Sequence, residues 1–301
     1  SALTPLPRPR WLPETAWPFE AFTFEVDGST VAFTDVGRGP VLLLVHTGLW
    51  SFIWRDVLVR LSRHFRCVCL DAPGTGRSGR PAARVDLEKS ARAVTALIDQ
   101  LGLTELVLVV HDLGGLTGVV GAARSSATVV GISAINAFAW RPEGTALRMM
   151  LRVVGSAAVR EFDVVTKLVP RVTATTFGVG RHLDAESRQA FLARLGANGI
   201  RAFHNYLADA LRSEALHAEA SAALDEQFAG LPLLTIFGEH NDPFHFQQEW
   251  RRRFPNATQL VIRGGNHFPM CDDPAFVAHA IDEWYRASTP QIEPIRAAHR
   301  Q

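Results

Sequence analysis

The clearest indication of the fold is the stretch Glu105-Leu-Val-Leu-Val-Val-His-Asp112-Leu-Gly-Gly-Leu-Thr117. Leu106 to Val110 form an unbroken apolar run, which is typical of a strand buried on both faces in the middle of a parallel sheet. The run ends at a carboxylate and a glycine pair, and a helix of small residues is predicted over 118–124. Because core packing explains a carboxylate there poorly, we interpret Asp112 as a reactive group. The structural alternative is an N-cap of the following helix.

The composition bounds the class of protein. The chain has 301 residues, of which 47% are hydrophobic, and a net charge of +1, which suits one large α/β domain with an inserted subdomain. The charge balance gives no reason to expect nucleic acid as a partner. The three cysteines lack the spacing of a disulfide framework or a zinc site, so we expect no metal. With no apolar run long enough for a span and no signal pattern, we expect a cytoplasmic protein without a membrane partner, and a homodimer stays open.

Strand and helix signals alternate on both sides of a long helical region. Strand signals stop at residue 137 and return after residue 230, and helical patterns dominate between them. We therefore predict an α/β fold with a mostly parallel eight-stranded sheet, helices on both faces and an inserted helical cap. The predicted domains are a core, formed by residues 1–136 and 231–301, and a cap formed by residues 137–230.

Three polar residues, Asp112, Asp242 and His267, follow predicted buried strands. In an open parallel sheet, ligands bind at the carboxyl ends of the strands. A carboxylate can attack carbon and form an ester, and a histidine base can then activate the water that breaks this ester. A second carboxylate would hold the imidazole in the useful tautomer. We assign these roles to Asp112, His267 and Asp242 in that order, with Glu239 or Asn241 as alternatives for the third.

Three motifs together resemble the epoxide hydrolase and haloalkane dehalogenase branch of the α/β-hydrolases. They are His111-Asp-Leu-Gly-Gly115, Asp71-Ala-Pro-Gly-Thr-Gly-Arg-Ser78 and Gly265-Asn-His267-Phe268. The resemblance covers roughly residues 20–286 and implies an α/β-hydrolase fold with Asp112 on the strand-to-helix turn of the nucleophile. It also implies that an electrophilic C–O or C–halogen bond is opened through an ester on Asp112, without a metal or an organic cofactor.

The residues that distinguish the two reactions of this branch match only in part. Dehalogenases usually carry a tryptophan after the nucleophile and often Asn or Glu after a His-Gly pair, whereas this chain has Leu113 and His46-Thr-Gly-Leu49. Epoxide hydrolases use cap tyrosines to protonate the epoxide oxygen, and Tyr206 resembles one of these, with plain packing as its alternative. His204 or His182 would replace the second tyrosine. Epoxide hydrolysis is therefore our leading expectation, and haloalkane dehalogenation is the alternative.

The remaining predicted site residues bind substrate rather than react with it. The backbone N–H groups of Leu113 and of Thr47 or Gly48 are predicted to hold the oxyanion of the tetrahedral intermediate. Trp50 and Trp140 complete the predicted substrate-binding set, although core packing explains Trp50 nearly as well. The expected substrate is a small, apolar electrophile. A serine esterase is disfavoured because no serine stands at the turn, and a non-catalytic ligand-binding protein is the alternative from another class.

Overall fold

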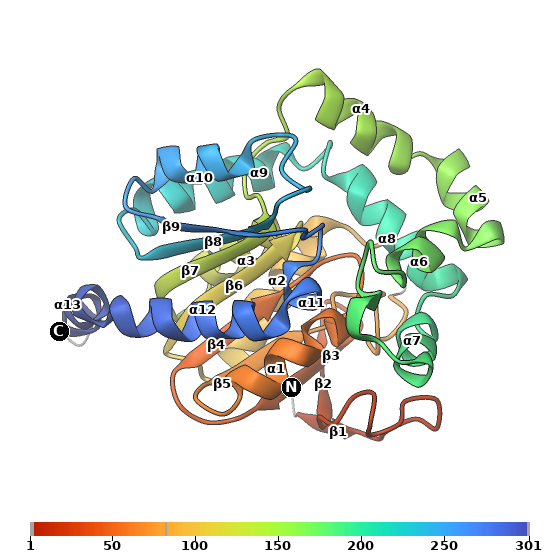
Figure 1. Ribbon diagram of the computed structural model, residues 1–301, viewed down its shortest axis with the longest axis horizontal. Coiled ribbons are helices and arrows are strands. Elements are labelled where there is room, and N and C mark those ends of the chain that lie inside the picture. Colours follow the sequence, from red (N-terminus) through yellow and green to blue (C-terminus); the bar gives the residue numbers. More distant parts are fainter. Residues whose placement is uncertain (1–2, 82, 300–301) are drawn as a thin grey trace.

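The computed structural model describes residues 3–81 and 83–299, and a sheet covered by helices on both faces forms the centre of the molecule (Figure 1). The strands are β1 (Thr4–Leu6), β2 (Ala21–Val26), β3 (Ser29–Val36), β4 (Val41–Val45), β5 (Arg66–Leu70), β6 (Glu105–Asp112), β7 (Thr128–Ala137), β8 (Leu233–Gly238) and β9 (Thr258–Ile262). Helices outside the β7–β8 connection are η1 (Ser51–Trp54), α1 (Arg55–Leu61), α2 (Leu87–Gln100), α3 (Gly114–Arg124), α10 (Phe246–Arg253), α11 (Pro269–Asp272), α12 (Pro274–Ala287) and α13 (Thr289–Ala298). Helices within that connection are α4 (Thr145–Val154), α5 (Ala157–Thr166), α6 (Leu168–Thr173), η2 (Gly180–His182), α7 (Ala185–Leu192), α8 (Ala197–Asp209), α9 (Glu214–Ala222) and the π-helical turn η3 (Ala223–Gln227).

The sheet has the strand order β1-β2-β3-β5-β4-β6-β7-β8-β9 in the described part of the chain. Strands β4 to β9 pair in parallel, whereas β1, β2 and β3 form antiparallel pairs at one side. The predicted α/β class and the mostly parallel sheet are confirmed. The predicted number of eight strands is wrong, because Thr4–Leu6 adds a ninth by pairing with β2. So short an edge strand has no periodicity that a sequence pattern could reveal.

Strand β6 lies at the centre of the sheet, hydrogen-bonded to β4 on one side and to β7 on the other. All side chains from Leu106 to Val110 are buried, as the apolar run predicts. The glycine pair after it has a steric cause: a Cβ at Gly114 would lie 2.2 Å from the carbonyl oxygen of Val45, and one at Gly115 would lie 2.3 Å from that of Phe138. The first turn of α3 can therefore approach the strand ends only with glycine there.

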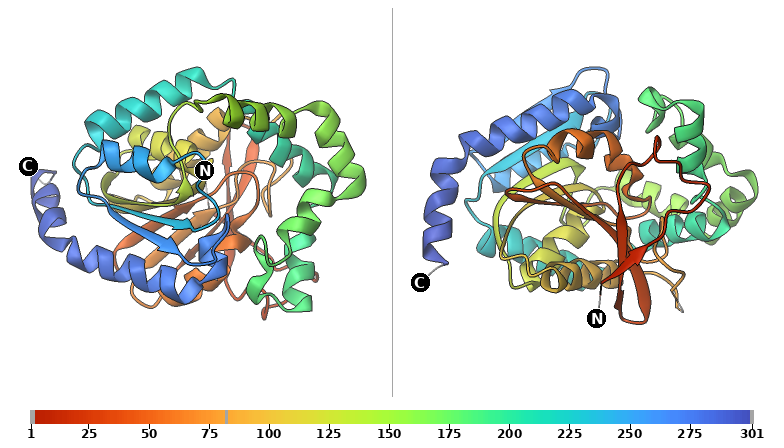
Figure 2. Two further views of the ribbon diagram at one scale, coloured as in Figure 1. Left: turned by 45° about the horizontal axis from the view of Figure 1, so that its top comes forward. Right: turned by 90° about the horizontal axis from the view of Figure 1, so that it is seen from below.

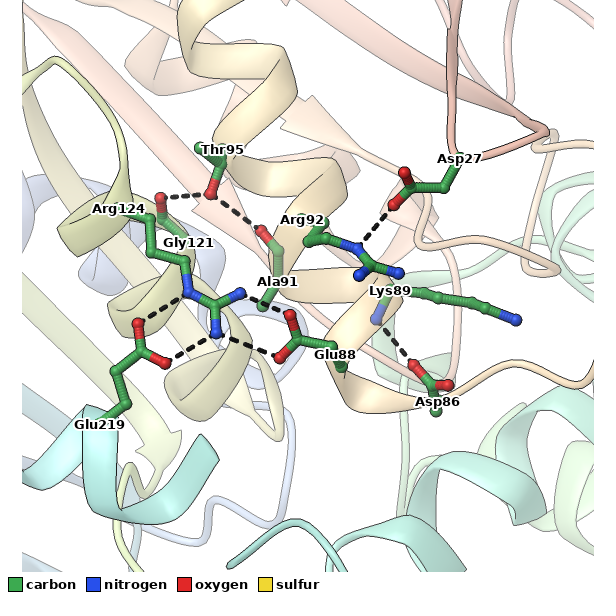
Figure 3. Close-up of polar contacts among 10 residues, drawn as sticks. All are labelled: Asp27, Asp86, Glu88, Lys89, Ala91, Arg92, Thr95, Gly121, Arg124 and Glu219. Carbon is green, nitrogen blue, oxygen red and sulfur yellow. Dashed lines mark hydrogen bonds and ion pairs between the residues drawn. The ribbon is translucent and has the colours of Figure 1, made fainter. Parts of the chain in front are cut away.

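Helix α3 is held in place by polar contacts with α2 and α9 (Figure 3). The guanidinium of Arg124 donates to Glu88 and to Glu219, with N–O distances of 2.7 Å to each carboxylate. The hydroxyl of Thr95 donates to the carbonyl oxygen of Gly121 at 2.8 Å. Exposed ion pairs contribute at most about 1 kcal/mol each, so their effect is to fix the helix that begins beside Asp112 rather than to stabilise the fold.

All helices from α4 to α9 lie between β7 and β8, which agrees with the predicted helical insertion. Helix α8 packs against α4 and α5, and Figures 1 and 2 show α4 and α5 on the outer side of this region, with α8 nearer the sheet. The proposed division at residues 137 and 230 stays a prediction. Within the described residues, no helix has the length and apolarity needed to cross a membrane.

Candidate active site

Asp112 stands at the sharp turn between β6 and α3. Its backbone φ is 51°, a left-handed conformation that a residue other than glycine seldom adopts. The strained turn lifts the side chain out of the sheet, and its carboxylate is 21% exposed and lines a cavity. Such a strand-turn-helix arrangement presents a nucleophile at the carboxyl edge of a sheet. Asp112 thus lines the cavity at this turn, and its role as a nucleophile stays a prediction.

His267 reaches the same cavity from the loop between β9 and α11. Its Nε2 atom lies 3.8 Å from Oδ2 of Asp112, which is too long for a hydrogen bond but close enough for electrostatic interaction. Burial alone would raise the pKa of Asp112, but the imidazole of His267 and the backbone N–H of Leu113 bring that pKa below its ordinary value. The carboxylate is thus ionised at neutral pH, the form in which it can attack carbon.

The partner of the His267 ring is Asn241. Nδ1 of His267 donates to Oδ1 of Asn241 at 2.7 Å, which leaves Nε2 facing Asp112. The prediction that Asp242 orients the ring is wrong. The carboxylate of Asp242 instead accepts the backbone N–H groups of Phe246 at 2.7 Å and Gln247 at 3.2 Å, where the first turn of α10 offers unpaired donors.

Glu239, the second alternative, is also occupied elsewhere. Its carboxylate accepts the backbone N–H of Gly264 at 2.7 Å. Of the three candidates that the sequence left open, Asn241 is thus the one that contacts His267.

The orientation of the Asn241 amide follows from its neighbour Asn136. Oδ1 of Asn136 accepts the backbone N–H of Gly238 at 2.8 Å, so Nδ2 of Asn136 points the other way and donates to Oδ1 of Asn241 at 2.9 Å. Oδ1 of Asn241 therefore accepts hydrogen bonds from both Asn136 and His267. A neutral amide fixes the same tautomer as a carboxylate would, as in Cys-His-Asn sites, but it stabilises an imidazolium less.

Two further histidines, His46 and His111, connect the walls of the site. Nε2 of His111 lies 2.7 Å from the carbonyl oxygen of His267, so it must carry a proton and donate. Burial, followed by the charges of His267 and His46, keeps the pKa of His111 well below its ordinary value, so the ring is neutral and its Nδ1 accepts. Nδ1 of His46, which lies 2.9 Å from Nδ1 of His111, is then the donor of this hydrogen bond. Nε2 of His46 accepts the backbone N–H of Leu49 at 3.0 Å.

This chain of neutral rings joins the turn after β4, the turn between β6 and α3 and the loop that carries His267. Sequence reasoning missed it, although a histidine at the end of each of two neighbouring buried strands was the available signal. Thr47 and Gly48 lie within the first turn, between His46 and Leu49, which both line the cavity. Their predicted oxyanion role stays a prediction.

The cavity has a volume of about 400 Å³ and two different sides. The core side comes from strand ends and the loops and helix starts that follow them, and it carries, among apolar residues, the polar residues His46, Asp112, Asn136, Asn241 and His267. The cap side comes from α4, α6 and α8 and is apolar except for Thr173; its apolar residues are Leu147, Met150, Leu151, Val154, Phe203 and Leu207. Among the described lining residues there is no tyrosine, tryptophan, lysine or arginine.

The predicted cap donors lie outside the cavity. Tyr206 is fully buried, and its hydroxyl donates to the carbonyl oxygen of Pro73 at 2.7 Å. His204 is also fully buried, with Nε2 2.8 Å from the carboxylate of Asp163. His182 contacts the carbonyl oxygen of Asp272. The prediction that these side chains contact substrate is wrong in position, because each is already paired with a group of the protein.

The two predicted tryptophans also pack rather than bind. Trp50 is 1% exposed, its indole N–H donates to the carbonyl oxygen of Phe191, and its ring lies 6.1 Å from that of Trp17. The ring centroid of Trp140 lies 5.0 Å from that of Trp250, and the guanidinium of Arg253 lies over its face. Neither tryptophan lines the cavity. The core-packing alternative for Trp50 is the one that its contacts support.

A family model described as the alpha/beta hydrolase family matches residues 42–280. A protein of Mycobacterium tuberculosis named haloalkane dehalogenase 2 is 28% identical over 279 residues, covering 89% of this chain and 95% of its own. A cis-3-alkyl-4-alkyloxetan-2-one decarboxylase of Shewanella oneidensis is 26% identical and covers 86% of each chain.

The solved structure of the haloalkane dehalogenase DbeA from Bradyrhizobium elkani has a similar fold, with a TM-score of 0.72 at 23% identity over 92% of this chain and 99% of that one. The structure of a putative ancestral haloalkane dehalogenase gives 0.74 at 22% identity, over 91% and 99%. Sequence motifs, fold and family model agree. The chain belongs to the alpha/beta hydrolase family and is a hydrolase similar to haloalkane dehalogenases.

Proposed function

We propose that this hydrolase forms an alkyl ester on Asp112 by displacing a group that leaves as a stable anion, with haloalkanes as the main substrate class. One observation carries the proposal: the described residues lining the cavity include no phenol, indole or cationic side chain. Asp112 attacks the carbon that carries the halogen, and the halide departs with the bonding electrons. His267 then activates the water that hydrolyses the ester.

The leaving group decides between the reactions considered from the sequence. Opening an epoxide generates an alkoxide, which is strongly basic and needs a proton donor at the oxygen. The hydroxyl of Tyr206 already donates its proton to the carbonyl oxygen of Pro73. Burial, followed by the charges of Asp86 and Asp209, raises the pKa of Tyr206 well above its ordinary value. A halide needs no proton. The missing acid thus supports the dehalogenase alternative over epoxide hydrolysis, and so do the names of the relatives.

A departing halide would still need hydrogen-bond donors. On the cavity wall these are the Thr173 hydroxyl and Nδ2 of Asn241, for which the described residues provide no partner, and the Leu113 backbone N–H, which also interacts with the Asp112 carboxylate. Neutral amides and hydroxyls can hydrogen-bond an anion, although they protonate an alkoxide poorly. We therefore propose that these groups stand in for the tryptophan and asparagine that are missing after Asp112 and His46.

A second candidate, decarboxylation of a β-lactone, is favoured by the neutral partner of His267. Attack by Asp112 on the alkyl carbon of the ring C–O bond would release a carboxylate, which also needs no proton. The carboxylate could then leave as CO₂, its C–C electrons forming an alkene while the alkyl–O bond breaks and returns the pair to Asp112. No water is activated, so the weak support of His267 by Asn241 would cost nothing.

A substrate panel tests both candidates. Terminal haloalkanes, a dialkyl oxetan-2-one and an alkyl epoxide of matched chain length are each incubated with the enzyme, and halide, CO₂ and diol are measured. We expect halide from the haloalkanes, no diol, and loss of every activity in Asp112→Asn. CO₂ with little halide would favour the second candidate. Rapid diol formation would contradict the proposal outright.

A further inference from the structure

Exposed apolar side chains concentrate on one part of the cap. Among the described residues, twelve large hydrophobic side chains are exposed, and eight of them lie between residues 149 and 177. These eight are Met149, Met150, Val153, Phe162, Val165, Leu168, Val172 and Phe177. Isolated exposed hydrophobic residues are ordinary, whereas such a concentration marks an interaction surface.

Six of the eight residues follow helical spacing. Met149 and Val153 on α4 are four residues apart, Phe162 and Val165 on α5 are three apart, and Leu168 and Val172 on α6 are four apart. Pairs at these spacings share one side of a helix. Figures 1 and 2 show α4 and α5 on the outer side of the cap, away from the sheet. We call the exposed sides of these three helices the α4–α6 face.

The same segment is basic. Residues 145–177 contain five arginines or lysines and two carboxylates, a net charge of +3 in a chain whose total is +1. Both carboxylates already have partners within the protein, since Glu161 forms ion pairs with two arginines and buried Asp163 contacts His204. In contrast, exposed Arg152, Lys167 and Arg171 form no ion pair within the described residues. Apolar anchors beside unpaired cations are typical of interfacial helices.

The α4–α6 face is continuous with the candidate active site. Met150 is 44% exposed and also lines the cavity, so an edge of the cavity reaches the surface at α4. Thr173, the last residue of α6, lines it as well. The cap side of the cavity is apolar except for Thr173, and molecules that suit it dissolve preferentially in lipid.

We propose that the α4–α6 face docks on the surface of a lipid bilayer that contains anionic lipids, with the cavity edge at Met150 turned toward the membrane. This departs from our expectation, drawn from the sequence, of no membrane partner. A second copy fits less well, because a two-fold interface would place the cations of this face against themselves. Anionic headgroups complement Arg152, Lys167 and Arg171, and acyl chains accept the residues between them.

Delivery of substrate from the lipid rests on the proposed function, but docking does not. Because vesicle binding is measured without turnover, a failure of the docking proposal would not contradict the proposed function, and a failure of the proposed function would not contradict docking. The full chain is sedimented with vesicles of phosphatidylcholine alone and of phosphatidylcholine mixed with phosphatidylglycerol, at low and high salt. We expect binding to the mixed vesicles only, weakened by salt.

Charge and apolar variants separate the two contributions. Each basic residue near an anionic surface strengthens binding about fivefold, so the triple variant Arg152→Gln, Lys167→Gln, Arg171→Gln should bind on the order of 100-fold more weakly. Its matched control changes three exposed arginines elsewhere and should bind like the wild type; it is Arg38→Gln, Arg63→Gln, Arg263→Gln.

The apolar pair Phe162→Ser, Val165→Ser should also lose binding, whereas Val59→Ser, Phe276→Ser should not, although those two side chains are exposed as well. Neither altered pair lines the cavity, so turnover of a water-soluble substrate should be unchanged and would report correct folding. Absence of vesicle binding in the wild type would overturn the proposal. So would a wild-type dimer in analytical ultracentrifugation that Phe162→Ser, Val165→Ser dissociates, since a second copy would then cover the face.

Discussion

The core side and the cap side of the cavity differ in how their polar groups are used. On the core side, every titratable side chain is tied to another: His267 to Asn241, His46 to His111, and Asp112 to His267 by proximity. Apart from the Thr173 hydroxyl, the cap side presents apolar groups to the cavity, and the polar groups of α8 point elsewhere. The difference is what the proposed function requires, in which the core supplies the chemistry and the cap selects substrates by shape and apolarity.

The largest effect is expected from His267→Gln, which tests whether the core side alone runs the reaction. Glutamine cannot act as a base, so ester hydrolysis should slow by about 10²–10⁴-fold, while attack by Asp112 should persist. Mass spectrometry after addition of a haloalkane should show a covalent adduct on the peptide that contains Asp112. Full turnover by this variant would remove histidine from the mechanism. Unchanged CO₂ release from a β-lactone would favour the second candidate, which activates no water.

The neutral histidine chain makes the core side sensitive to acid. Burial, followed by the charge of His267, lowers the pKa of His46 from its ordinary value of 6.5 to about 3 in the folded protein. The unfolded state therefore binds more protons below pH 6.5, and the free energy of unfolding should fall as the pH drops from there toward 3. One such histidine contributes a slope of up to about 1.4 kcal/mol per pH unit.

Chemical denaturation at several pH values measures this slope. His46→Gln should reduce this slope by the contribution of one proton, about 1.4 kcal/mol per pH unit. The substitution should also lower the free energy of unfolding at neutral pH. His279→Gln is the matched control, because the His279 side chain is 78% exposed and should leave the slope unchanged. Equal slopes in wild type and His46→Gln would show that His46 is not held neutral.

The sequence predicted the core side well because its signals are local. A buried strand followed by a carboxylate and two glycines defines the Asp112 turn, and the glycines are dictated by carbonyl oxygens within 2.3 Å of any added Cβ. Asn241 and Asp242 could not be separated, since adjacent residues share the same strand end. Only the start of α10, whose backbone N–H groups at Phe246 and Gln247 donate to Asp242, decides which of them faces His267.

The cap side was predicted poorly because helical patterns do not state which way a cap helix faces. Phe203 and Tyr206 are three residues apart on α8, yet Phe203 lines the cavity and Tyr206 points to Pro73. The packing of α8 against α4, α5 and the chain after β5 sets this rotation, and such contacts are remote in sequence. The hydrophobic pattern of the sequence also gave no distinct boundaries for the helices α4 to α6, because their packing too depends on contacts that are remote in sequence.

A smaller effect is expected from Asn241→Asp, which sharpens the difference between a neutral and a charged partner. The carboxylate would still accept from His267 and Asn136, but it would stabilise the imidazolium. Ester hydrolysis should become about tenfold faster, and the acid limb of the pH–rate profile should move up by about one pH unit, because His267 must be neutral to act as a base. Asp242→Asn is the matched control: it removes a carboxylate one residue away that caps α10, so it should affect stability and leave the acid limb in place.

The smallest effect on turnover is expected from Tyr206→Phe, and it decides whether the cap side takes part in the chemistry. The Tyr206 hydroxyl donates to the Pro73 carbonyl, so its loss should lower the free energy of unfolding by about 1 kcal/mol. Halide release should change less than about twofold, because no phenol O–H reaches the cavity and a halide needs no proton. Phe203→Ala, one turn away on the same helix, should instead raise KM for haloalkanes by enlarging the cavity. It removes no hydrogen bond, because the phenylalanine side chain has no polar group. If Tyr206→Phe slowed epoxide opening by the 10²-fold or more that follows loss of a general acid, α8 would have to rotate during turnover, and the assignment of chemistry to the core side alone would fail.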